Sequence, residues 1–113
     1  MDATRAAHAC RALRGVTEGY PFSPDALVFK VGGRIFAILG GDSISLKCDP
    51  MLAVALREEF PRAVTAGYHL NKRHWNTVTL DGAVPSELLE EWIEDSYALA
   101  VASLTRAQRA ALG

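Results

Sequence analysis

Residues 67–78, GYHLNKRHWNTV, bring together side chains that bind anions and stack on rings, and they include no acidic residue. Cations such as Lys72 and Arg73 attract phosphate groups, and amide and phenol groups donate hydrogen bonds to phosphate oxygens. The aromatic rings of Tyr68 and Trp75 provide flat faces on which an unpaired base can stack. The stretch is therefore a candidate surface for DNA or another polyanion.

Cations from the preceding segment are expected to extend this surface. In SISLKC (43–48), Lys47 lies between Leu46 and Cys48, and the alternation of a strand turns it away from these apolar neighbours toward water. Lys30 lies between two apolar residues in the same way. The predicted nucleic-acid-binding set is Lys30, Arg34, Lys47, Tyr68, His69, Asn71, Lys72, Arg73, His74, Trp75 and Asn76.

Two other interpretations of the same residues remain open. In a purely structural one, Trp75 packs in the core, Asn71 holds a turn, the histidines are half-buried and the cations are ordinary solvated charges. In the other, the basic residues recognise an anionic small molecule or an acidic protein partner, beside a pocket lined by Tyr20, Tyr68, His69, His74 and Trp75.

The charge distribution limits what kind of nucleic-acid binding can be expected. The net charge is −1, which removes the argument from a strongly basic domain. Residues 26–80 carry seven basic and four acidic side chains, whereas residues 81–113 carry two and six. No segment expected to be helical concentrates the Arg, Asn and Gln side chains that read a major groove. Non-specific binding, with a Kd of roughly 10⁻⁴ to 10⁻⁶ M, is the form that remains.

Metal, cofactor and catalytic sites are not expected. The spacing of His69 and His74 does not identify a metal site, and His8 and Cys10, two apart on a helix, point to different faces. No third group is available to orient a nucleophilic pair of Cys48 with a histidine. The two cysteines lie far apart without a CxxC pair, which favours small buried hydrophobic roles over a disulfide framework. We expect a non-enzymatic protein without a cofactor.

Hydrophobic spacing and turn residues predict the elements of the first half of the chain. A helix is expected over about 3–14, followed by an ordered loop in which Tyr20 and Phe22 reach back into the core. LVFKV and RIFAIL flank the pair Gly32-Gly33, a connection typical of a β-hairpin. The alternating strand at 43–48 follows a second turn at 40–42.

The second half of the chain is predicted to be mainly helical. Asp49-Pro50 begins a helix whose stripe of Leu52, Leu56 and Phe60 lies on the sheet. The tail of the stretch that begins at Gly67, NTVTL (76–80), is predicted to be a strand. A long helix begins near Pro85-Ser86 with Trp92 on its apolar side and an acidic, solvated opposite side, and a short helix follows Thr105.

Length and composition set the overall class. With 113 residues, half of them hydrophobic, we expect one domain over 1–113. We expect the protein to be monomeric. We also expect it to be cytoplasmic, because no apolar run approaches the roughly 20 residues of a membrane helix. The predicted architecture is α+β, a two-layer arrangement of a twisted antiparallel sheet packed on helices in the order αβββαβ(β)αα.

Five short segments, in order, resemble the MmcQ/YjbR family of small bacterial proteins. These are EGYPF (18–22), RIFAIL (34–39), SLKCDP (45–50), YHLNKRHWNTV (68–78) and SY (96–97), which together cover nearly the whole chain. The resemblance implies a CyaY-like fold, similar to that of frataxin, and a DNA-binding protein with a double-wing-like arrangement of hairpins. Arg34 departs from the lysine more usual in the family, but either cation suits a phosphate.

Overall fold

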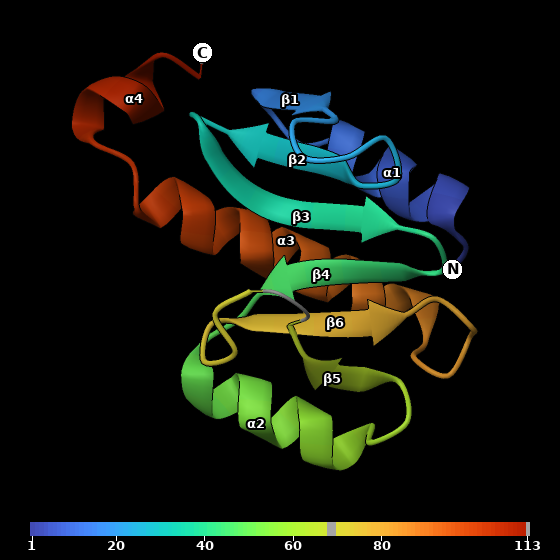
Figure 1. Cartoon of the computed structure of the whole chain (residues 1–113). Helices are drawn as coiled ribbons and strands as arrows, with labels where there is room; N and C mark the ends of the chain where they lie inside the picture. Colours follow the sequence, from blue (N-terminus) through green and yellow to red (C-terminus); the bar gives the residue numbers. More distant parts are fainter. Residues whose placement is uncertain (68–69, 113) are drawn as a thin grey trace.

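Antiparallel strands form one twisted sheet, and helices cover one of its faces (Figure 1). The computed structural model describes residues 1–67 and 70–112. Within them the sheet has six strands in the order β1-β2-β3-β4-β6-β5. The strands are β1 (Val16–Gly19), β2 (Leu27–Val31), β3 (Arg34–Gly40), β4 (Ser43–Lys47), β5 (Val64–Ala66) and β6 (Trp75–Thr79), and the helices are α1 (Ala3–Arg11), α2 (Pro50–Glu59), α3 (Ser86–Ala102) and α4 (Arg106–Ala110).

Side-chain caps fix the beginnings of three helices, as their sequences predict. The Asp2 carboxylate accepts a hydrogen bond from the Arg5 amide at the start of α1. Asp49 caps α2 directly before a proline at the first helical position. At α4, Thr105 and Gln108 form a reciprocal capping box. These caps satisfy amide groups that have no partner inside the helix.

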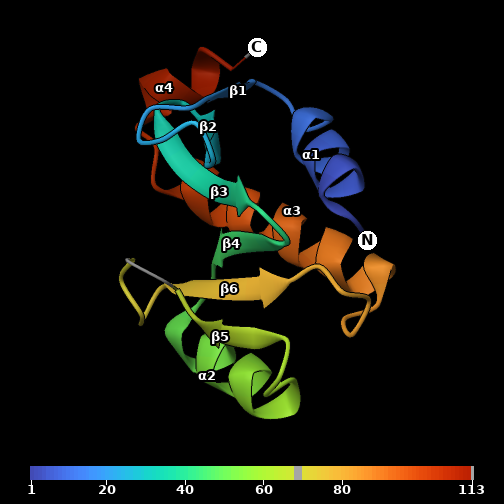
Figure 2. The ribbon, with the colours of Figure 1, turned by 45° about the vertical axis from the view of Figure 1, so that its right-hand side comes forward.

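The hydrophobic core lies between the sheet and the helices. Ile44 and Leu46 of β4 face the helices, and the intervening Ser45 and the following Lys47 face the opposite side. Helices α1 and α3 lie along the covered side, and α2 lies beside β5 and β6 (Figure 2). None of the helices in the described part of the chain is long and apolar enough to cross a membrane.

Strand β1 is the main departure from the predicted elements. It is an edge strand that pairs with β2 alone, and its Glu18 and Gly19 gave no apolar alternation from which to predict it. Glu18 accepts hydrogen bonds from the guanidinium of Arg11, at 2.5 and 2.8 Å, which ties β1 to α1. That bond holds the pKa of the Glu18 carboxyl below its ordinary value.

Two predictions about apolar side chains are wrong. Tyr20 and Phe22 are exposed because their loop runs beyond the edge strand, and the core is filled without them. In α2, Ala53 and Leu56 are buried, whereas Leu52 is exposed. The small side chain of Ala53 allows the helix backbone to approach the sheet, and this turns Leu52 toward the space between α2 and α3.

Candidate nucleic-acid interface

The cations predicted from separate strands lie at one end of the sheet. Strands β2 and β4 end where β3 and β6 begin (Figure 1). Lys30 is paired with Ile35, next to Arg34, and Lys47 is paired with Trp75. The backbone therefore places Lys30, Arg34 and Lys47 at the ends of neighbouring strands, on the same end of the sheet.

Lys47 is the central cation of this end. It projects from the face of the sheet opposite the helices, and its Nζ lies 5.7 Å from the centroid of the Trp75 ring. This separation is within the range of a cation–π interaction. Burial, and secondarily the nearby guanidinium of Arg34, lower the pKa of the Lys47 ammonium below its ordinary value. Lys47 is thus a partly desolvated cation beside a second cation.

The turn before β6 carries two further cations next to Lys47. The Cys48 amide donates to the His74 carbonyl at 2.8 Å, which ties the turn to the end of β4. Asn71 shapes the turn, because its side-chain oxygen accepts from the Arg73 amide at 3.0 Å. The side chains of Asn71, Lys72, Arg73 and His74 are all exposed. Asn71 therefore has the turn-holding role of the structural interpretation, while the cations that it presents remain accessible.

Arg57 supports this turn from α2, and its role was not predicted. Its guanidinium donates to the Lys72 carbonyl at 2.9 Å and to the Ala53 carbonyl at 3.2 Å. The sequence contains no signal for the first contact, because the two residues come from different elements and only the fold brings them together.

Two predicted binding residues have positions that limit their contact with a ligand. Asn76 is 3% exposed and lies on the helix-covered face, where its Nδ2 donates to the Ala53 carbonyl at 3.2 Å. It cannot share a surface with Lys47, since strand alternation turns it to the other side of β6 from Trp75. Trp75 is 9% exposed, and Lys47 lies over its ring, so the ring has no open face for a base. Tyr68 and His69 lie outside the described residues.

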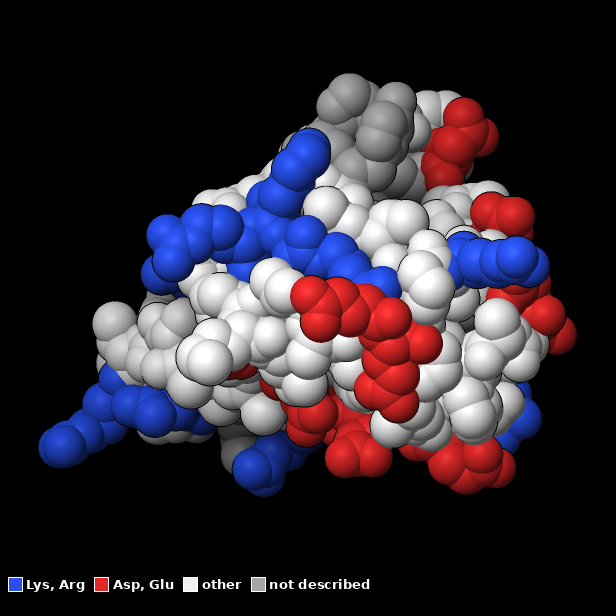
Figure 3. All heavy atoms as spheres, turned by 90° about the horizontal axis from the view of Figure 1, so that it is seen from below, with Lys and Arg blue, Asp and Glu red and all other residues white. Residues whose placement is uncertain are grey.

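Acidic side chains do not neutralise this end of the sheet. Lys30, Arg34, Lys47, Lys72 and Arg73 form no ion pair with the acidic residues that the structure describes. Among the described residues, the ion pairs join Arg5 to Glu90 and Arg11 to Glu18, which lie outside this set of cations. Viewed from below, several basic side chains gather on the left of the surface, others lie at its bottom and right, and the acidic ones lie toward the middle and right (Figure 3). We call the five cations the basic end.

The cysteines show no sign of reactivity. Cys10 is buried, and burial raises the pKa of its thiol to about 12. Cys48 is half-buried, and burial together with the carboxylates of Asp49 and Asp95 raises the pKa of its thiol. A thiol is a nucleophile or metal ligand only as its thiolate. Among residues 1–67 and 70–112, no three His, Cys, Asp or Glu side chains are grouped closely enough to hold a metal ion.

Comparison with known proteins extends over most of the chain. The YjbR family model matches residues 11–99. The chain is 36% identical to the uncharacterized protein YbdF of Escherichia coli O157:H7 over 91 residues, which cover 77% of this chain and 74% of YbdF. It is 34% identical to the uncharacterized protein YjbR of Escherichia coli K12 over 104 residues, which cover 88% and 87% of the two chains.

Solved structures have the same arrangement of elements. A DUF419-domain protein from Deinococcus radiodurans is 41% identical and superposes with a TM-score of 0.92, over 99% of this chain and 88% of that one. A protein from Pseudomonas syringae is 26% identical and superposes with a TM-score of 0.77, over 88% and 99%. The family match and these relatives together show that the chain belongs to the YjbR family.

Proposed function

We propose that this chain is a non-enzymatic, cytoplasmic protein that binds DNA without sequence specificity through the basic end. One observation carries the proposal: Lys47 and Arg34 lie near each other at the same end of the sheet, where burial first and the Arg34 guanidinium second lower the pKa of the Lys47 ammonium, and neither cation pairs with a described carboxylate. Holding like charges together without a counter-charge costs free energy that a bound polyanion recovers. A row of phosphates supplies that counter-charge.

The arrangement of the connections supports the same proposal. The Gly32-Gly33 turn joins β2 and β3 at the end of the sheet where the 70–74 turn precedes β6. Two projecting connections on one basic end fit the double-wing-like description of the family. Cations on strand ends and turns contact phosphates and do not read base edges, so the expected binding is non-specific.

Counterion release sets the expected salt dependence and affinity of DNA binding. If about four phosphates are contacted, the logarithm of the binding constant falls with the logarithm of the salt concentration with a slope of about −3.6. The expected Kd at physiological salt is in the range of roughly 10⁻⁴ to 10⁻⁶ M.

Fluorescence anisotropy tests the proposal. A labelled duplex and a labelled single strand are titrated at two salt concentrations with the natural chain, with Lys72→Ala/Arg73→Ala and with Arg106→Ala/Arg109→Ala. The control pair removes the same charge from exposed positions on α4. We expect steep salt dependence, a loss of binding of at least tenfold in the first pair and little change in the control.

Two results would overturn the proposal. One is binding that ignores salt, and the other is equal weakening by the two double substitutions. Binding to an anionic small molecule or to an acidic protein, with no binding to DNA, would instead support the ligand interpretation of the same cations.

A further inference from the structure

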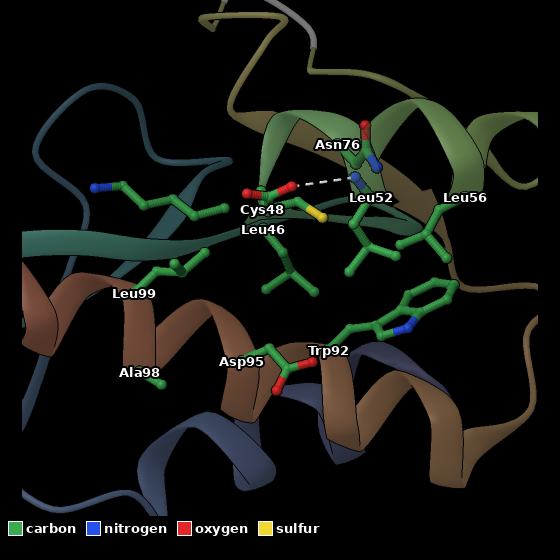
Figure 4. A pocket seen from close by; sticks show the side chains of 11 residues that line it. Leu46, Cys48, Leu52, Leu56, Asn76, Trp92, Asp95, Ala98 and Leu99 are labelled. Atoms are coloured by element: carbon green, nitrogen blue, oxygen red, sulfur yellow. Dashed lines mark hydrogen bonds between the residues drawn. The ribbon is translucent and has the colours of Figure 1, made fainter.

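A groove separates α2 from α3 on the helix-covered side of the sheet, and its lining reaches Lys47 at the end of β4. It encloses a cavity of about 360 Å³, within the size range of small-molecule sites. Leu52 and Leu56 of α2 face Trp92 and Leu99 of α3 across it, above Leu46 of β4 (Figure 4). The walls are therefore almost entirely apolar.

Packing explains why the groove stays open at one end. Phe60 and Trp92 meet edge to face with their ring centroids 5.7 Å apart, which joins α2 to α3. Toward the beginning of α2 the two helices present Leu52 and Leu99, and both side chains are exposed. Met51, one residue earlier, is 85% exposed. A contiguous apolar mouth of this kind, rimmed by polar groups, is typical of a binding site.

The polar groups of the groove are predominantly negative. Asp95 extends its carboxylate into the groove, beside Trp92 (Figure 4), and it has no ion-pair partner within the described chain. Asp49 also lines the groove. Burial raises the pKa of the Cys48 thiol there, and the carboxylates of Asp49 and Asp95 raise it further, against an opposing contribution from Arg57. Lys47 contributes to the lining, but its ammonium lies over Trp75.

The floor of the groove carries one buried amide side chain. Asn76 lines the groove, and its Nδ2 is engaged by the Ala53 carbonyl. The Asn76 Oδ1 is buried and has no hydrogen-bond partner among the described residues. The carboxylates of Asp95 and Asp49 are therefore the groups that make the groove more favourable for a cation than for an anion.

We propose that this groove binds a small organic cation, with an apolar body between Leu52 and Trp92 and an ammonium group facing Asp95. An apolar body explains the leucine walls, and a positive head explains an unpaired carboxylate at their edge. Trp92 adds a ring face that attracts cations. Lys47 belongs both to the lining of this groove and to the basic end, so the two sites adjoin at that residue, whereas Lys30, Arg34, Lys72 and Arg73 do not line the groove.

Matched probes test the charge preference. In a Trp75→Phe background Trp92 is the remaining tryptophan, and its emission is followed while hexylamine, hexanol or hexanoate is added at neutral pH. Amide shifts in ¹H–¹⁵N spectra of the unsubstituted chain give a second readout that does not depend on the Trp75 substitution. We expect saturable binding with hexylamine tightest and hexanoate weakest, and shifts at Leu52 and Leu99.

Matched substitutions locate the site. Asp95→Asn should weaken hexylamine binding about fivefold, as expected for one carboxylate about 4 Å away in water, and leave hexanol binding unchanged. Glu94→Gln, an exposed neighbour outside the groove, is the charge control.

A second pair of substitutions tests the location by blocking the groove. Ala98→Phe should block all probes, whereas Ala102→Phe, exposed on the same helix outside the groove, should not. Absence of saturable binding in both readouts, no preference for the amine, or a preference that survives Asp95→Asn would overturn the proposal.

Discussion

Lys47 and Trp75 face each other across β4 and β6, and the ammonium of one lies 5.7 Å from the ring centroid of the other. This pair both supports the Lys47 ammonium and places it near the other cations of the basic end. The indole supports the cation on the open face of the sheet, and the strand ladder fixes Lys47 beside the 70–74 turn. The apolar alternation of β4 therefore positions a charge on the open face as well as side chains in the core.

The titration of Lys47 should report on Arg34. Burial is the larger cause of its lowered pKa, and the Arg34 guanidinium is the second. In Arg34→Ala the pKa of Lys47 should rise toward its ordinary value without reaching it, because the burial remains. Binding of a polyanion should also raise it, since phosphate favours the charged form. Lysine side-chain NMR titrations measure both, with Arg106→Ala as the control that should leave the pKa of Lys47 unchanged. A pKa that does not rise in Arg34→Ala would contradict the assigned proximity.

Ser96 should be important for stability and for the position of Lys47. Its buried hydroxyl donates to the Phe36 carbonyl at 2.6 Å and accepts from the Lys47 amide at 2.9 Å. Ser96→Ala leaves both backbone groups without that partner, at a cost of about 1–3 kcal/mol for each buried group. Urea denaturation should show this loss, whereas Ser103→Ala, at an exposed site, should cost well under half as much. Equal losses of unfolding free energy in Ser96→Ala and Ser103→Ala would show that the two buried hydrogen bonds of Ser96 contribute no more than the single one of Ser103.

Gly67 should be intolerant of any side chain. A Cβ at this position would lie 2.6 Å from the Trp75 Cβ and 3.2 Å from the Trp75 carbonyl oxygen. Gly67→Ala should therefore cost about 1–3 kcal/mol of unfolding free energy through overpacking. Gly19→Ala is the control, because its Cβ would meet no atom within 4 Å. Similar urea midpoints for the two variants would mean that β6 shifts freely.

Trp92→Ala should destabilise the fold more than Trp75→Ala. The two side chains are similarly buried, at 8% and 9% exposure, but Trp92 packs within the main core cluster and against Phe60. Truncating a buried aromatic residue costs about 3–5 kcal/mol. Trp75 has Lys47 over its ring on the outer face, where water replaces lost contacts more easily. Chemical denaturation that gave the reverse order would make Trp75 the more important core residue.

Local rules in the sequence predicted the elements that depend on local contacts. The Gly32-Gly33 hairpin, the Asp49 cap and the outward side of Lys47 follow from residues within a few positions of each other. Strand β1 was missed because its pairing and its ion pair depend on partners distant in sequence.

The candidate site was predictable only in part for the same reason. Asn76 was predicted to contact phosphate but is buried on the helix-covered face, because the side of β6 to which it points could not be read from a polar stretch. The groove depends on how closely α2 approaches α3, which the small side chain of Ala53 and the exposed position of Leu52 determine only once the helix is packed.

The central claim is that the basic end meets nucleic acid, and a ¹H–¹⁵N titration with a short unlabelled duplex at low salt tests it most directly. We predict progressive shifts at Arg34, Lys47 and residues 71–75, with α1 and α4 unchanged, and reversal of the shifts when salt is added. Shifts confined to other surfaces, or no shifts at millimolar duplex, would contradict the account.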